Sequence, residues 1–113
     1  MARVVTVFWS KMRDDVPPEY EELSAELEML ARQIDGFVDY RSLTAANGDH
    51  LSIAVFETAQ AEATWRDHVA HQQAQRRGRE RFYEWYDVSV CEERRHHHWE
   101  AQSGNPQELP GSN

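Results

Sequence analysis

Cysteine is almost absent from this chain, and long apolar runs are missing. One cysteine, Cys91, stands among 113 residues, so no intramolecular disulfide can form and no cysteine pair has zinc-site spacing. No run approaches the roughly 20 apolar residues that cross a bilayer. The amino terminus MARVVTVFW also lacks the apolar segment of a signal peptide. We therefore expect a soluble, cytoplasmic protein with no membrane partner.

Basic side chains are also scarce. The chain carries 12 Lys and Arg against 20 Asp and Glu, a net charge of -8, so its field repels phosphate backbones. This balance argues against nucleic acid as a partner. At 40% hydrophobic residues, the length fits a single domain with a modest core. We place that domain at residues 1–95 and expect residues 96–113, rich in Gly, Pro, Ser and Asn, to form a flexible tail.

Hydrophobic periodicity predicts the order strand, helix, strand, strand, helix, strand. Residues that suit a pleated surface predict four strands, at 3–10, 37–44, 51–57 and 83–92. This order is that of an α+β, ferredoxin-like βαββαβ fold, with a four-stranded antiparallel sheet and helices on one face. The other face carries apolar residues without cover in a monomer, so we expect a homodimer that buries it.

The helices have their own signals. Apolar residues three and four apart predict an amphipathic helix from Tyr20 to Ile34. Thr58 can cap a second helix that reaches about Asp67 and resumes after His68, as one helix or two.

Two turn and strand details follow from the pattern. Asn47-Gly48 predicts a hairpin between the second and third strands, because both residues tolerate positive φ. Strict alternation places Tyr83 on the same strand face as Trp85 and opposite Tyr86.

Several segments together resemble the antibiotic biosynthesis monooxygenase domain, a dimeric α/β-barrel family. They are VVTVFW, DGF, NGD, WRDHVAH and QRRGRERFYEWYDVSVCE, within residues 3–94. The resemblance implies two ferredoxin-like protomers packed sheet to sheet, each with an apolar cavity between sheet and helices. It further implies cofactor-free oxygenation of a small aromatic, phenolic or quinone-like molecule by O₂.

The resemblance also suggests site residues. Trp65 matches the family's pocket tryptophan and His71 its signature histidine, although Val69 and Ala70 replace the Pro-Glu that often precedes it. The branch of the family that degrades haem has an Asn in the first strand and a His ten residues beyond the tryptophan. Here the first strand lacks Asn and that later position is Gln75, so haem degradation is disfavoured.

Chemistry assigns provisional roles to these and other side chains. A cofactor-free oxygenase needs a base, a dry cavity and aromatic walls. Imidazole titrates near neutral pH, so His71 or His68 can serve as the base, and Arg76 or Arg79 can hold a phenolate. We predict Trp65 and His71 as catalytic, and we predict substrate contacts at Trp9, Tyr40, His68, Arg79, Tyr83 and Tyr86.

Each assignment competes with a structural role. Aromatic residues at these spacings also form ordinary cores, and most of the arginines fit a solvated helix face that pairs with acidic neighbours. Three adjacent histidines, 96–98, seldom close a metal shell alone, so we predict neither a metal nor another cofactor. A binding protein without turnover remains the alternative to an enzyme.

Overall fold

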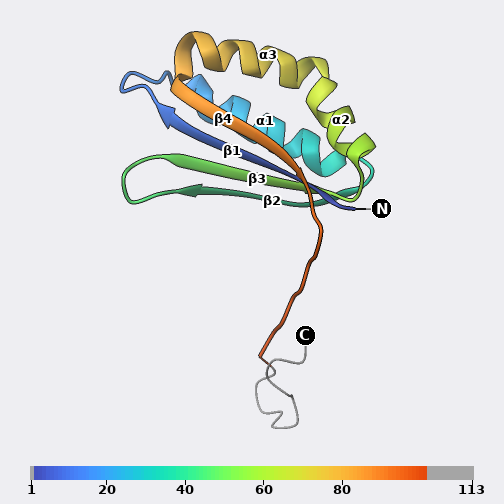
Figure 1. Cartoon of the computed structure of the whole chain (residues 1–113). Coiled ribbons are helices and arrows are strands. Elements are labelled where there is room, and N and C mark those ends of the chain that lie inside the picture. Colours follow the sequence, from blue (N-terminus) through green and yellow to red (C-terminus); the bar gives the residue numbers. More distant parts are fainter. Residues whose placement is uncertain (1, 102–113) are drawn as a thin grey trace.

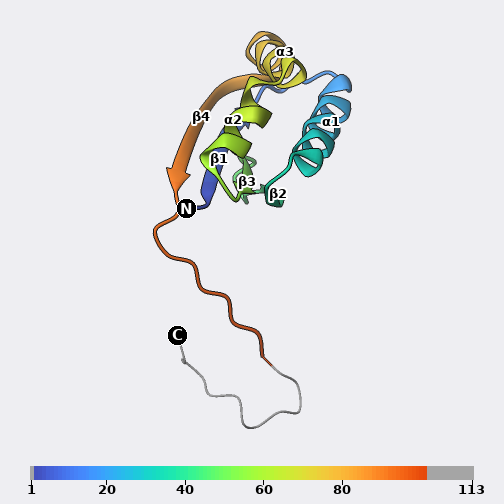
Figure 2. The same ribbon diagram turned by 90° about the vertical axis from the view of Figure 1, so that its right-hand side faces the viewer.

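The computed structural model describes residues 2–101 and has the predicted α+β architecture. Four strands form one open antiparallel sheet, and the helices lie on one side of it (Figures 1 and 2). The strand order is β2-β3-β1-β4, so β1 and β3 are central, as their apolar sequences predict. The strands are β1 (Val4–Met12), β2 (Phe37–Thr44), β3 (His50–Phe56) and β4 (Tyr83–Glu92).

Helix α1 (Glu19–Gln33) begins where proline allows it to begin. Pro18 occupies the N-cap, and the first turn holds Glu19, Glu21 and Glu22, which complement the positive end of the helix dipole. The helix ends before Ile34, and Gly36 then takes a φ of 96°, a conformation that favours glycine.

The second helical region is two helices rather than one. The Thr58 hydroxyl accepts a hydrogen bond from the Ala61 amide and caps α2 (Ala59–Asp67). His68 then adopts an extended backbone, with ψ at 140°, and α3 (Val69–Arg77) follows. A five-residue π-helix, η1 (Gly78–Phe82), connects α3 to β4.

The hairpin between β2 and β3 forms, but only one of its two turn residues takes positive φ. Gly48 has a φ of 92° and no non-glycine residue has a positive φ within residues 2–101, so Asn47 departs from the expected conformation. Ala45 and Asp49 close a three-residue loop, which ends in a left-handed glycine. Asn47 instead accepts a hydrogen bond from the Asp49 amide through its side chain.

A bulge at Glu84 overturns the predicted orientation of Tyr83. Lys11 pairs with Trp85 while Met12 pairs with Tyr83, so one residue of β4 is unmatched. The shift turns Tyr83 to the helix side, where it lies against Phe8 and Tyr86. Trp85 stays on the opposite face.

The hydrophobic core lies between the sheet and the helices. It is built on Phe56 and Trp65, together with Ala31, Ala54 and Ala61, and all five are buried. The opposite sheet face has no cover from residues 2–101. Its apolar side chains alternate in register with the helix-facing ones: Val5, Val7, Trp9, Leu43, Leu51, Ile53, Val55 and Trp85.

The chain leaves the domain after β4. Glu93 is still tied to β1, because its amide donates to the Arg3 carbonyl and its carboxylate pairs with the Arg3 guanidinium at 2.9 Å. Beyond it, residues 94–101 run away from the domain as an extended segment (Figure 1). His96 contacts Arg3 and His98 contacts Glu100. The rest of the predicted tail, 102–113, lies outside the described residues.

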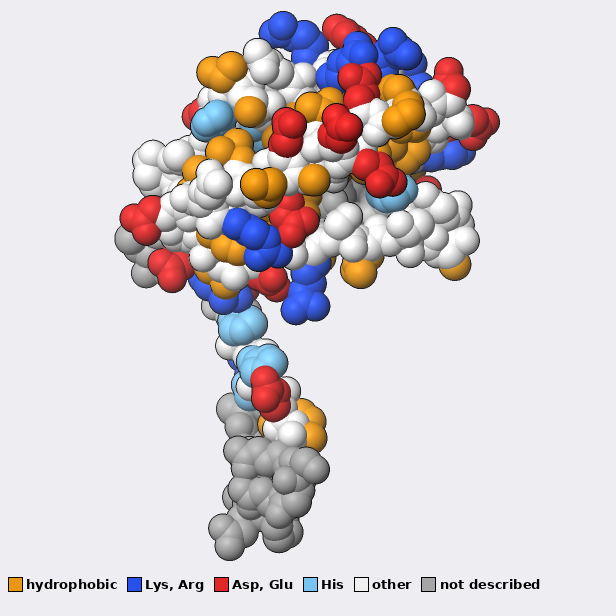
Figure 3. Space-filling view, turned by 180° about the vertical axis from the view of Figure 1, so that it is seen from behind, with side chains coloured by type: hydrophobic (Ala, Val, Ile, Leu, Met, Phe, Trp, Pro, Cys, Tyr) orange, Lys and Arg blue, Asp and Glu red, His pale blue; other side chains and the backbone are white. Residues whose placement is uncertain are grey.

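The helical layer carries mixed charge on its outer surface (Figure 3). Arg77 pairs with Glu19 of α1, whereas Arg76 and Arg81 are exposed. This arrangement agrees with the prediction that most of these arginines lie on a solvated helix face beside acidic side chains. Within residues 2–101, no helix has the length and apolar character needed to span a bilayer.

Candidate functional site

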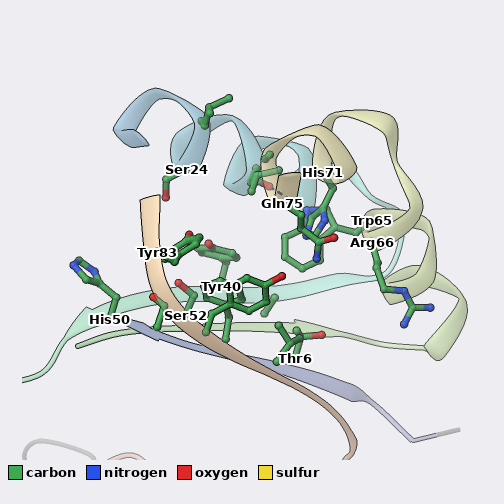
Figure 4. Close-up of a pocket in the computed structure, with 18 of the residues that line it drawn as sticks. Thr6, Ser24, Tyr40, His50, Ser52, Trp65, Arg66, His71, Gln75 and Tyr83 are labelled. Atoms are coloured by element: carbon green, nitrogen blue, oxygen red, sulfur yellow. Dashed lines mark hydrogen bonds between the residues drawn. The ribbon is translucent and has the colours of Figure 1, made fainter. Parts of the chain in front are cut away.

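A pocket of about 110 Å³ lies between the helix side of the sheet and the three helices. Figure 4 shows Trp65, His71 and Gln75 at one end of it and His50 at the other, with Tyr40 and Tyr83 between them. Every strand and all three α-helices contribute to the lining. The walls are mainly aromatic and aliphatic, as a site for a small apolar molecule requires.

Trp65 fixes the inner end of the pocket. Its indole N–H donates to the Leu27 carbonyl of α1 at 3.1 Å, and its ring packs on Phe56 with centroids 5.5 Å apart. The Tyr40 ring lies 6.4 Å from it, edge to face. Trp65 is therefore both a core residue and a wall of the pocket.

His71 stands edge-on to Trp65, with ring centroids 4.5 Å apart. Burial lowers the pKa of His71 to about 4, and the positive charge of Arg66 adds to the effect. The imidazole is thus neutral at neutral pH, and the predicted titration near pH 7 does not occur here. A neutral imidazole can accept or donate one hydrogen bond, but it is a weak base at this pKa.

The aromatic wall at the other end comes from β1, α1 and β4. Phe8 stacks on Tyr86 at 5.2 Å and lies 5.4 Å from Tyr83. Tyr20 meets Tyr83 edge to face at 6.3 Å. Burial raises the pKa of Tyr20, Tyr40 and Tyr83, so all three phenols stay protonated and available as hydrogen-bond donors.

Three buried polar atoms in this pocket lack a hydrogen-bond partner among the described residues. They are Thr6 Oγ1, Ser10 Oγ and His71 Nδ1, on side chains that are at least nine-tenths buried. An unsatisfied buried polar atom costs about 1–3 kcal/mol, so such atoms are rare without a reason. All three residues line the same cavity, although the three atoms themselves have almost no surface open to it.

Five of the eight sequence-predicted residues line the pocket: Trp65, His71, Tyr40, Tyr83 and Tyr86. Arg79 lies at the rim, where it donates to the Tyr86 hydroxyl at 3.2 Å. His68 is exposed outside the pocket, and its Nδ1 caps α3 by accepting from the Ala70 amide.

Trp9 is placed on the opposite sheet face from the pocket. It is 50% exposed, donates to Asp49 and packs edge-on against Trp85. The expectation that it walls the cavity does not hold, because Thr6, Phe8 and Ser10 supply the pocket face of β1. Alternation along β1 assigns Trp9 correctly to the face opposite Phe8, but it does not tell which face the helices cover.

Sequence reasoning missed Thr6, Ser10 and Glu62. The two hydroxyls had a signal, because they share a strand face with the buried Val4 and the pocket-lining Phe8. For Glu62 the sequence signal was weak, because only its helical spacing from Trp65 placed it near the predicted site. It is 3% exposed and lines the pocket, and burial raises its pKa against the opposing effect of Arg66.

Comparison with known proteins gives a fold and a distant relative. No protein-family model matches the chain. The uncharacterized protein YqjZ of Bacillus subtilis (strain 168) is 29% identical over 85 residues, 75% of each chain.

Solved structures of similar fold include an oxygenase. SnoaB, a cofactor-independent oxygenase from Streptomyces nogalater, has a TM-score of 0.69 and 16% identity, over 85% of this chain and 97% of its own. A Nitrosomonas europaea protein provisionally assigned as an antibiotic biosynthesis monooxygenase has a TM-score of 0.70 and 11% identity, over 81% of this chain and 90% of its own. The domain is therefore antibiotic biosynthesis monooxygenase-like in fold, as the sequence resemblance implied.

The Tyr83 ring packs closely over Gly78, which gives a first prediction. A Cβ at Gly78 would lie 2.6 Å from Tyr83 Cε2, a clash that the ring must move to avoid. We expect Gly78→Ala to destabilise the protein by about 1–3 kcal/mol in urea unfolding. In a Tyr83→Ala background, Gly78→Ala should leave the free energy of unfolding almost unchanged. Equal costs in both backgrounds would show that Gly78 does not act through Tyr83.

His71 makes stability depend on pH. Its folded pKa of about 4 is below the ordinary value of 6.5, so its contribution is complete above about pH 6.5 and is lost as the pH falls toward 4. The loss amounts to roughly 3 kcal/mol. We expect His71→Phe to remove this part of the pH dependence of unfolding, whereas replacing the exposed His97 should leave it intact. Identical pH slopes for wild type and His71→Phe would contradict the assignment.

Proposed function

We propose that this chain is a cofactor-independent monooxygenase for a small aromatic, phenolic or quinone-like molecule. The observation that carries the proposal is the aromatic pocket, whose lining also includes Thr6, Ser10 and His71, each with a polar atom that lacks a partner among the described residues. A phenol or quinol supplies a flat apolar ring for the walls and hydroxyl groups for these atoms. The shared fold with SnoaB adds support for oxygen chemistry.

The oxygenation reaction needs few protein groups besides a base and the dry pocket. A base removes the hydroxyl proton of the substrate, and the resulting phenolate, whose charge is delocalised onto ring carbon as carbanion character, gives one electron to O₂. The two radicals combine into a peroxide, which loses water, so one oxygen atom enters the product and the other leaves as water. A dry pocket favours this course because it excludes solvent protons from the carbanion. The neutral His71 contributes a polar edge to the pocket, and Trp65 holds the substrate ring plane beside it.

The size of the pocket limits the substrate. An engineered cavity of about 150 Å³ admits benzene, so an enclosed volume near 110 Å³ accommodates about one ring. The pocket is also lined by Val88 and Val90 of the edge strand β4, which are 44% and 45% exposed. A second ring can therefore extend toward this side.

A specific observation favours the alternative of binding without turnover. The low pKa of His71 leaves the predicted base weak, while the aromatic walls and unpartnered hydroxyls bind a ligand equally well in a protein that does no chemistry. Haem finds less support, because His68 lies outside the pocket and His71 is packed against Trp65.

We propose further that a second copy of the chain covers the free sheet face. Trp9, Leu43 and Trp85 are 50%, 55% and 41% exposed on that face, next to the half-buried Val7 and Ile53. A monomer rarely leaves an apolar surface of this kind in water, and a self-complementary face suits a twofold dimer.

Oxygen uptake distinguishes the two functions. We expect quinols of one or two rings, such as hydroquinone and 1,4-naphthalenediol, to be oxidised faster than three-ring anthrone, with one atom from ¹⁸O₂ in the product. Trp65→Phe should lower kcat/KM at least about tenfold, a loss of about 1.4 kcal/mol. Trp99→Phe, in the extended segment, should leave it unchanged. No uptake with any member of the panel, together with a raised Tm, would identify a binding protein instead.

The dimer is tested by mass in solution. Sedimentation equilibrium should give twice the chain mass of 13.2 kDa. Ile53→Asp places a charge in the middle of the covered face and should shift the population toward monomer, whereas Gln73→Asp on the exposed surface of α3 should not. A wild-type monomer at micromolar concentration would refute the sheet-to-sheet dimer.

A further inference from the structure

Glu62 is a buried carboxyl group to which the proposed mechanism has so far given no role. It projects from α2 with 4% of its side chain exposed, at helical spacing from Trp65 and Arg66. The Glu62 carboxylate forms an ion pair with Arg66, whose Nη1 lies 3.3 Å from Glu62 Oε1. A carboxyl group almost never occupies such a position unless it is paired or functional.

Glu62 lies where two cavities meet. It lines the aromatic pocket with Trp65 and His71, and it also lines a second, more open cleft between α2 and β4. Arg66 and Val90 are the other residues common to both cavities. Glu62 therefore borders the aromatic pocket on one side and the more open cleft on the other.

We propose that Glu62 accepts the substrate proton in the pocket and releases it to solvent through the second cleft. This assignment rests on the proposed oxygenase function. In the step, the substrate O–H bond breaks, its electron pair remains on the substrate oxygen, and the proton bonds to a carboxylate oxygen of Glu62. A water molecule in the cleft then takes the proton, which restores the carboxylate before the next turnover.

The electrostatics favour Glu62 over His71 in this role. Burial raises the pKa of Glu62 toward the working range of a general base, while burial lowers the pKa of His71 away from it. Arg66 pairs with the carboxylate before the transfer. Once Glu62 is neutral, the Arg66 charge remains beside the pocket and stabilises the new phenolate.

The ionisable groups around Glu62 come from three elements. Arg66 and Asp67 are on its own helix, His71 of α3 lies across the pocket, and Cys91 and Glu92 of β4 lie across the cleft. Asp67 and Arg66 act on Glu62 in opposite directions, and burial remains the largest influence on its pKa.

The test compares Glu62→Gln, which keeps the shape and removes the proton acceptor, with Glu62→Asp, which keeps the carboxylate. Glu26→Gln, on the exposed surface of α1, is the matched control. With the best quinol, Glu62→Gln should lower kcat at least about 100-fold with KM within about threefold, and should abolish the acid limb of the pH profile. Glu62→Asp should retain that limb, and His71→Phe should shift it little.

A binding measurement separates this assignment from the oxygenase proposal. The probe is 2-naphthol, titrated calorimetrically between pH 8 and pH 5. We expect wild-type Kd to weaken toward acid pH as Glu62 takes up a proton, and Glu62→Gln to bind with a pH-independent Kd. Wild-type protein that shows this pH dependence but consumes no oxygen would end the oxygenase proposal and leave Glu62 as the acceptor of the ligand proton.

Two results would overturn the role of Glu62. One is a Glu62→Gln variant that consumes oxygen at the wild-type rate with the wild-type pH profile, which leaves the oxygenase proposal standing. The other is a Kd for 2-naphthol with the same pH dependence in wild type and Glu62→Gln. Near-ultraviolet circular dichroism checks that the variant keeps its packing around Trp65.

Discussion

The arrangement of this domain depends on one buried side chain, Trp65. Its indole N–H is hydrogen bonded to the Leu27 carbonyl, which ties α2 to α1, and its ring contacts Phe56 of β3 and His71 of α3. A buried indole needs a partner for its N–H, and this carbonyl supplies it. The same ring then forms the inner wall of the pocket. Packing and site formation are therefore two consequences of one interaction rather than competing explanations of the residue.

Burial around Trp65 also determines the chemistry that the pocket can support. Removal from water disfavours charge, so it lowers the pKa of His71 and raises that of Glu62. The histidine becomes a neutral polar group, while burial shifts the carboxyl group in the opposite direction, toward a stronger base. One physical cause thus assigns different roles to two residues that lie on successive helices of the same wall.

Much of the fold follows from sequence because its signals are local. The helical spacing from Tyr20 to Ile34, the Thr58 cap and the Gly48 turn each act over a few residues, and the antiparallel order follows from short connections. The site is less accessible to this reasoning. One unmatched residue in β4 turns Tyr83 into the pocket, and alternation alone cannot reveal a bulge.

Other site residues depend on tertiary contacts that the sequence does not record. His68 looks equivalent to His71 along the chain, yet one caps a helix at the surface and the other is buried against Trp65. In the sequence, Glu62 resembles the many glutamates of the surface, and only the packing of α2 over the sheet buries it. The resemblance to a family of oxygenases pointed to Trp65, and the structure places this side chain in the pocket wall.

We propose that a small aromatic molecule binds in the cavity beside Trp65. The chain has four tryptophans, two of them on the free sheet face and one in the extended segment, so their indole N–H signals report on separate regions. The most direct measurement is a two-dimensional ¹H–¹⁵N NMR titration with 2-naphthol. We expect the Trp65 indole signal to move in a saturable way while those of Trp9, Trp85 and Trp99 stay in place. Saturable movement of Trp9 and Trp85 with Trp65 unchanged would contradict it, because the ligand would then occupy the opposite face of the sheet.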